Sequence, residues 1–136
     1  MAAKFNQDEL LRAAQDASAR AYAPFSKFFV GAAILTSSGK IYSGCNVENS
    51  SYGLTNCAER TAIFTAIAEG ADNGKLDIQA VAVVNRDGVP CAPCGACRQV
   101  IYEFGPNAVV IYKGKGRTVE QTPITALLPE GFRLER

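Results

Sequence analysis

The sequence contains no histidine, and this absence restricts the chemistry available to the chain. Any zinc site must therefore be built from sulfur and oxygen ligands, and no imidazole can act as a general base. Long apolar runs are also missing, since none approaches the roughly 18 residues of a membrane span. Residues 1–11 lack the apolar stretch of a signal peptide and include the acidic Asp8 and Glu9. We therefore expect a cytoplasmic protein.

A strong excess of charge of either sign is missing as well, with 14 Lys and Arg residues against 13 Asp and Glu residues. No global field would gather nucleic acid or an anionic membrane, so a small neutral partner fits better. The five cysteines are an odd number, which in a reducing compartment favours free thiols or metal ligands over disulfides. The length of 136 residues predicts a single domain spanning residues 1–136.

Apolar periodicity and capping residues predict an α/β fold. The first helix is expected to run from a cap at Asn6 to Tyr22, and Gly70 is placed to end the second helix. The other helices are expected to open at Asn56 or Cys57, at Cys94, and at Thr122 with Pro123 in the first helical position. Expected strands span residues 27–36 and 41–45, paired antiparallel, then 78–85 of the buried parallel kind, 108–112 and 117–120. This order favours a three-layer α-β-α sandwich with a mixed, mostly five-stranded sheet.

The segments CAER and PCGACR, residues 57–60 and 93–98, carry the most specific chemical signal. Cys94 and Cys97 form a C-x-x-C pair, whose spacing lets two thiolates from one turn reach a single metal, and Cys57 offers a third sulfur. Glu59 would lie close to such a metal, where a carboxylate can handle the protons of a bound water. A closed structural site would not need this carboxylate.

Zinc bound by three thiolates carries net negative charge, which weakens its ability to acidify water. Two helix N-termini would offset part of this charge. Arg60, three residues after Cys57 on the same side of a helix, is expected to compensate the rest, with Arg98 as a second candidate. The alternative for Arg60 is a solvent-facing helix residue, as most arginines are.

These segments resemble the signature of the cytidine deaminases, in the small homotetrameric form that binds zinc through three cysteines. The motifs YAPFSKF, VGAA, GCNVEN and LLP extend the resemblance over most of residues 10–132. It implies a hydrolase that converts cytidine and deoxycytidine to uridine and deoxyuridine with release of ammonia, in pyrimidine salvage. It also implies one zinc ion per chain and a homotetramer with shared active sites, in which Tyr52 and Phe132 complete a neighbouring subunit's pocket.

The resemblance assigns roles to further residues. Cys57, Cys94 and Cys97 would hold the zinc, and Glu59 would move protons between water, N3 of the base and the departing amino group. The substrate-binding residues that it implies are Phe28, stacked on the pyrimidine, Asn46 and Glu48, hydrogen-bonded to the ribose 3′-hydroxyl, and Ala58, whose backbone contacts the base.

Without the resemblance, other environments are expected for the same residues. Phe28 would be a core aromatic in a β-run, and Asn46 and Glu48 would be surface residues of a polar loop. If Glu48 does face the ribose, its negative charge would disfavour a phosphate, so we expect nucleosides to be preferred over nucleotides.

Three other functional classes remain open from the residues alone. A structural zinc module would add Cys45 or Cys91 as a fourth sulfur, although we interpret Cys45 as a small buried hydrophobe and Cys91 as a bystander in a loop. A thioredoxin-like redox pair would leave Cys57 and Glu59 without a purpose. A nucleic-acid editing enzyme would share the chemistry, but the basic cluster at 113–117 is more simply a solvated turn.

Overall fold

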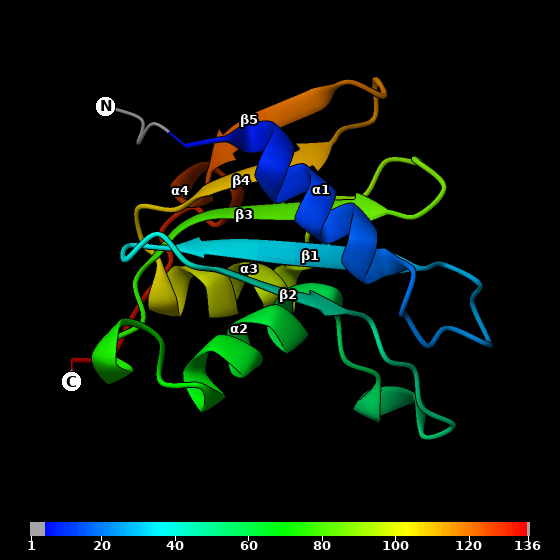
Figure 1. The fold of residues 1–136 in the computed structure, drawn as a ribbon, viewed down its shortest axis with the longest axis horizontal. Coiled ribbons are helices and arrows are strands. Elements are labelled where there is room, and N and C mark those ends of the chain that lie inside the picture. Colours follow the sequence, from blue (N-terminus) through cyan, green and yellow to red (C-terminus); the bar gives the residue numbers. More distant parts are fainter. Residues whose placement is uncertain (1–4, 136) are drawn as a thin grey trace.

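A mixed five-stranded sheet forms the middle layer of the protein (Figure 1). The computed structural model describes residues 5–135. The strand order is β2-β1-β3-β4-β5. The strands are β1 (Val30–Thr36), β2 (Ile41–Cys45), β3 (Ile78–Asn85), β4 (Val109–Lys113) and β5 (Val119–Pro123). The α-helices are α1 (Gln7–Ser18), α2 (Ala58–Ala68), α3 (Gly95–Phe104) and α4 (Ile124–Leu127), with 3-10 turns η1 (Tyr52–Leu54) and η2 (Ala71–Gly74).

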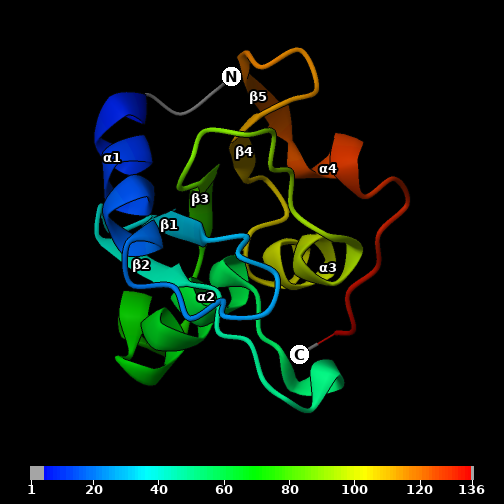
Figure 2. The same cartoon turned by 90° about the vertical axis from the view of Figure 1, so that its right-hand side faces the viewer.

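Helices cover both faces of this sheet, which confirms the predicted sandwich. Figures 1 and 2 show α1 on one face and α2 and α3 on the other. Side chains alternate between the two faces along each strand, so neighbouring residues of β1 enter different clusters. On the α1 side the buried residues are Leu10, Ala14, Ala33, Ala80, Ala82 and Ile111. The larger cluster under α2 and α3 includes Ala32, Ile34, Ile63, Val81, Val83 and Ile101. Within residues 5–135, no helix has the length and apolar character needed to cross a membrane.

Local signals placed several boundaries correctly. The side chain of Asn6 accepts a hydrogen bond from the backbone N–H of Glu9 at 3.0 Å, as expected for a helix cap. Gly70 follows the last turn of α2 with a left-handed φ of 74°. Strands β2 and β3 have the predicted bounds. However, β3 is parallel only to β4 and antiparallel to β1, so the sequence predicted its burial correctly and its pairing only in part.

Several predicted boundaries were wrong. Strands β4 and β5 begin one and two residues later than expected, at Val109 and Val119. Three larger differences arise because tertiary contacts override local preference. Helix α1 ends at Ser18, since Tyr22 pairs with Val47 in an isolated parallel bridge. Strand β1 begins at Val30, because residues 24–26 form a turn and residues 27–29 have no regular secondary structure. Thr122 does not cap α4. It pairs with Val110, so β5 runs on through Pro123, which is the N-cap of α4.

The topology brings two helix N-termini to one edge of the sheet. Strands β2 and β3 point the same way because each is antiparallel to β1. Their C-terminal ends therefore lie beside the start of β1, where Gly31 pairs with Cys45 and Val30 pairs with Asn85. Helices α2 and α3 follow β2 and β3 in the chain and both begin at this edge, which is where the candidate site lies.

Candidate active site

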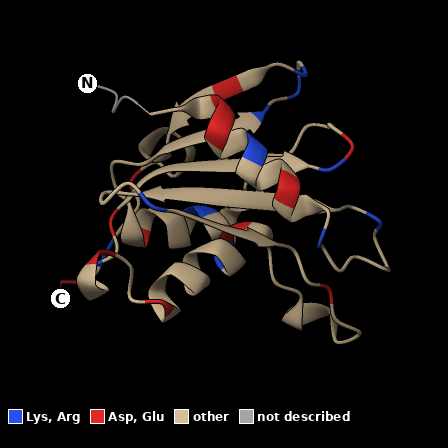
Figure 3. Cartoon of the chain, in the orientation of Figure 1, with Lys and Arg blue, Asp and Glu red and all other residues tan. Residues whose placement is uncertain are grey.

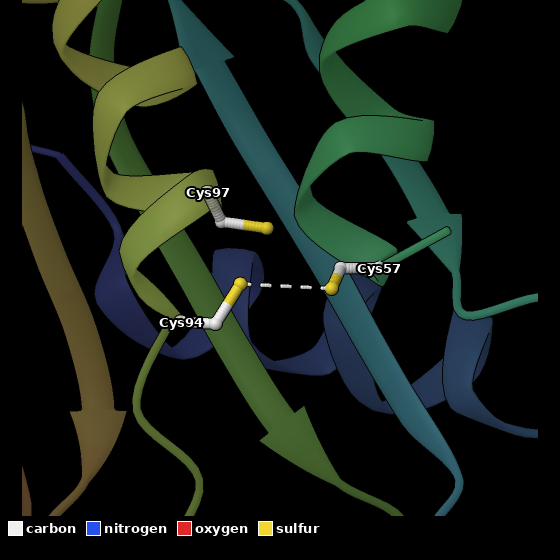
Figure 4. A group of neighbouring side chains, drawn as sticks. All are labelled: Cys57, Cys94 and Cys97. Atoms are coloured by element: carbon white, nitrogen blue, oxygen red, sulfur yellow. Dashed lines mark hydrogen bonds between the residues drawn. The ribbon is translucent and has the colours of Figure 1, made fainter. Parts of the chain in front are cut away.

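Three cysteine thiols meet where α2 and α3 begin. Cys57 and Cys94 are the N-caps of these helices, and Cys97 lies buried in the first turn of α3. Their sulfur atoms lie within 4.8 Å of one another, and Sγ of Cys57 is 3.7 Å from Sγ of Cys94 (Figure 4). A tetrahedral zinc ion at about 2.3 Å from each sulfur would separate the sulfurs by about 3.8 Å. The cluster therefore fits zinc in both donor type and spacing.

The fourth-sulfur alternatives do not join this cluster. Cys45 is half-buried at the end of β2, and Cys91 is buried in the loop before α3. Among the described residues, the cluster of potential ligands consists of Cys57, Cys94 and Cys97 and includes neither of these thiols. Burial raises the pKa of the Cys91 thiol to about 12, with the negative charges of Glu59 and Cys57 adding to the effect. Cys91 is thus a neutral thiol beside the site.

Glu59 is a buried carboxylate in the first turn of α2. Only 4% of its surface is exposed, whereas isolated charged groups avoid such burial. Desolvation raises its pKa to about 7, and the negative charge of Cys57 adds to the rise. A carboxyl group with a pKa near neutrality can both accept and donate a proton at physiological pH, which suits a general acid–base catalyst.

Arg60 faces the thiol cluster rather than solvent. Its Nη2 donates a hydrogen bond to Sγ of Cys57 at 3.1 Å. The pKa of Cys57 falls to about 5, chiefly because Cys97 donates a hydrogen bond to it and further because of Arg60. As the donor in that pair, buried Cys97 has its pKa raised. The predicted second cation, Arg98, is used elsewhere: it donates to the carbonyls of Pro93 and Leu127 at 2.8 and 3.0 Å.

A cavity of about 300 Å³ opens beside the cluster, a volume at the lower end of small-ligand sites. Its lining includes the residues that the resemblance assigned to the substrate, Phe28, Asn46, Glu48 and Ala58, together with Cys57, Glu59 and Cys94. Sequence reasoning missed the six other lining residues, Ser26, Val30, Thr55, Asn56, Cys91 and Ala92. Ser26 had a weak signal, because it lies two residues before Phe28 in the same motif.

The environments expected without the resemblance were wrong for three cavity residues. Phe28 is not a core residue, since 41% of its surface is exposed. Asn46 and Glu48 are buried, because their side chains hydrogen-bond the backbone of the turn before β1. The Ser26 hydroxyl donates to the Glu48 carboxylate and, with the backbone N–H groups of Phe25 and Ser26, lowers the pKa of Glu48.

Tyr52 and Phe132 lie outside this cavity within one chain. Both are strongly exposed, at 87% and 67%. Tyr52 lines an adjoining cavity with Phe25, Ser26, Glu48 and Thr55. Phe132 lies in the segment after α4, where its carbonyl accepts a hydrogen bond from Gln99 at 3.2 Å. Their part in a shared site stays a prediction.

The predicted basic cluster lies in the β4–β5 hairpin. Basic and acidic residues are otherwise spread over the described elements (Figure 3). Lys113 donates a hydrogen bond to the carbonyl of Gly88 at 3.0 Å and so holds a neighbouring loop. Part of the positive charge of the hairpin, that of Lys113, therefore has a structural role.

Both the sequence and the fold of the chain have known relatives. Residues 5–113 match the family model described as the cytidine and deoxycytidylate deaminase zinc-binding region. The chain belongs to the cytidine deaminase family. It is 46% identical over 132 residues to a cytidine deaminase of Sporosarcina psychrophila, with 94% of this chain and 92% of that protein covered. It is 47% identical to a probable cytidine deaminase of Dictyostelium discoideum, with coverages of 96% and 88%.

The solved structures agree with the sequence relatives. The crystal structure of cytidine deaminase from Burkholderia pseudomallei superposes with a TM-score of 0.83 at 49% identity, covering 94% of this chain and all of that one. The three-layer fold, the three-cysteine cluster and the family are therefore mutually consistent, and membership of this family makes the chain a hydrolytic deaminase.

Proposed function

We propose that this cytidine deaminase family member converts cytidine and deoxycytidine to uridine and deoxyuridine, releasing ammonia, in the salvage of pyrimidines. The arrangement of Glu59 carries the proposal. A buried carboxylate beside three thiols and an open cavity suits hydrolysis, whereas a closed structural metal site has no use for it.

One zinc ion per chain would be held by Cys57, Cys94 and Cys97, and zinc in such a site lowers the pKa of water. Glu59 would take a proton from the attacking water, deliver it to N3 of the ring and later protonate the departing amino group. Arg60, already hydrogen-bonded to Cys57, would offset the negative charge of the thiolates. The N-termini of α2 and α3 would add partial positive charge.

The nucleoside would be held by the other cavity residues. Phe28 offers an exposed ring for stacking, and the backbone of Ala58 would contact the base. Glu48 accepts three hydrogen bonds from the chain, and a carboxylate has about four acceptor sites, so capacity remains for a ribose hydroxyl. Asn46 uses one amide hydrogen on the carbonyl of Phe28, which leaves the other for the ribose.

We further propose that the chain is a single domain that works in the cytoplasm as a homotetramer. The strong exposure of Tyr52 and Phe132 supports this assembly, because large aromatic side chains are favoured at protein interfaces. In the tetramer, these rings would complete the cavities of neighbouring subunits.

The decisive experiment follows the absorbance of cytidine with purified protein before and after chelation, together with a zinc count. We expect turnover that is lost with the metal and one zinc per chain. Cytidine 5′-monophosphate should be a poor substrate, because its phosphate would be repelled by Glu48. Zinc-edge X-ray absorption should show three sulfurs and one lighter ligand. Four sulfurs, with no turnover of cytidine, would instead establish the structural zinc module.

A further inference from the structure

Residues 25–29 turn the chain into β1 without being part of a helix or strand, and Phe28 in this turn lines the cavity. Lys27 in this turn has a φ of 58°, in the left-handed region that non-glycine residues occupy at a cost. Such a conformation persists only when the surroundings fix it. The contacts that hold this turn therefore decide where the Phe28 ring lies.

Two buried polar side chains fix the two ends of the turn. Asn46 holds the C-terminal end, since its Oδ1 accepts from the N–H of Val30 at 2.9 Å and its Nδ2 donates to the carbonyl of Phe28 at 2.8 Å. Glu48 holds the N-terminal end, since its Oε1 accepts from the N–H groups of Phe25 and Ser26 at 2.9 and 3.2 Å.

Ser26 connects these two anchored ends. Its hydroxyl donates to Oε2 of Glu48 and accepts from the N–H of Phe28 at 3.0 Å. These two hydrogen bonds span the left-handed Lys27. Through the Ser26 hydroxyl they link the buried carboxylate of Glu48 to the backbone of Phe28. A hydroxyl that donates to a carboxylate is polarised, which strengthens the bond that it accepts.

Phe29, the residue after Phe28, is anchored by Arg86. The guanidinium of Arg86 lies 3.9 Å from the centre of the Phe29 ring, and the N–H of Arg86 donates to the carbonyl of Phe29 at 2.8 Å. Phe29 is therefore held against the loop after β3. Phe29 and the carbonyl of Phe28 are thus both held, and the N–H of Phe28 is held by Ser26. The orientation of the Phe28 ring therefore depends on the Ser26 bridge.

We propose that Ser26 is a positioning residue of this site, whose hydroxyl bridges Glu48 to the backbone of Phe28 and sets the base-stacking ring. The inference rests on the proposed function, because it assumes that Phe28 stacks on the pyrimidine. Ser26 itself would act on substrate only through that ring.

The test compares Ser26→Ala with Ser26→Thr, which keeps the hydroxyl and can place its methyl group in solvent because residue 26 is exposed. Ser26→Ala should raise the KM for cytidine and the Kd for uridine, measured by calorimetry, about tenfold, equal to about 1.4 kcal/mol. The kcat and the zinc content should change little. Ser26→Thr should restore both constants, and the control Ser50→Ala, at an exposed serine of the neighbouring loop, should stay within about twofold of wild type.

A double-mutant cycle with Phe28→Ala separates positioning from a general structural role. If Ser26 acts through the ring, Ser26→Ala should reduce kcat/KM by less than about twofold once the ring is absent. A full tenfold loss in that background would show that Ser26 acts elsewhere, for example through Glu48 and the ribose, and would overturn the proposal. Unchanged constants in Ser26→Ala alone would also overturn it. A wild-type protein that neither deaminates cytidine nor binds uridine would instead refute the proposed function, and this inference with it.

Discussion

Gly44 in β2 lies directly against the backbone of α2, the helix that carries Glu59, so Gly44→Ala should damage the site from a distance. A Cβ atom at position 44 would lie 2.5 Å from the backbone nitrogen of Ala62 and 2.9 Å from the carbonyl carbon of Thr61. Favourable carbon contacts begin near 3.5 Å, so α2 would have to move outward by about 1 Å. Neither obstacle is the flexible end of a side chain, and a rotamer change cannot relieve the overlap.

The size of the effect follows from this displacement. Overpacking typically costs about 1–3 kcal/mol, and we expect the upper end for backbone atoms, about 3 kcal/mol. For a chain of this size that corresponds to a fall in Tm of about 10 °C. Because α2 carries Cys57 and Glu59, a shift of about 1 Å should also reduce kcat/KM on the order of 100-fold.

Gly31→Ala is the matched control. A Cβ atom at Gly31 would lie 1.9 Å from the carbonyl oxygen of Ala14, so this change displaces α1, on the face of the sheet that carries no site residue. Both variants should melt at lower temperature by circular dichroism. Assayed where both are folded and at equal protein concentration, only Gly44→Ala should lose zinc or activity per folded molecule. Equal losses of activity in the two variants, or a wild-type Tm for Gly44→Ala, would refute the reasoning.

Three further substitutions test the site itself. Glu59→Gln should keep one zinc per chain while turnover falls about 10²–10⁴-fold, and a variant with near-normal turnover would remove Glu59 from the mechanism. Cys91→Ala should keep its zinc and its activity but lose about 1 kcal/mol in urea unfolding, because Cys91 packs in the core cluster; loss of the metal would make Cys91 a ligand after all. Glu48→Gln should be less stable than wild type above the ordinary glutamate pKa of 4.5. The folded-state pKa of Glu48 lies below 4.5, so this difference in stability should shrink as pH falls from 4.5 through the folded-state pKa. A pH-independent difference would contradict the role of the charge.

The parts of the fold that follow from local chemistry could be predicted from the sequence. The Asn6 cap, the Gly70 helix end and the apolar run of β3 are encoded within a few residues, and each appears where expected. The meeting of Cys57 with Cys94 depended on two helices starting at one edge, which the order of elements suggested and the sheet topology confirms.

The parts that depend on distant partners could not be predicted in this way. Asn46 and Glu48 read as surface residues because their partners, the backbone groups of residues 25–30, lie 16 to 23 positions away. The same long-range hydrogen bonds hold Phe28 outside β1, although the residues around it favour a strand. Thr122 illustrates a different error. Its local sequence favours a helix cap, but in the structure it pairs with Val110 in the sheet.

The absence of histidine and the topology of the sheet are linked through the charge of the site. A donor set of three thiolates is more negative than one that includes imidazole, and this extra charge opposes the acidification of water by zinc. Placing Cys57 and Cys94 at the N-caps of α2 and α3 puts both sulfurs beside the positive ends of helix dipoles. Arg60 adds a full charge at 3.1 Å from one sulfur. A thiol-only site at the side of a helix would lack the contribution of the helix dipoles. Strands β2 and β3 run in the same direction and bring both helix starts to one edge. This common direction is therefore what makes a site without histidine chemically workable.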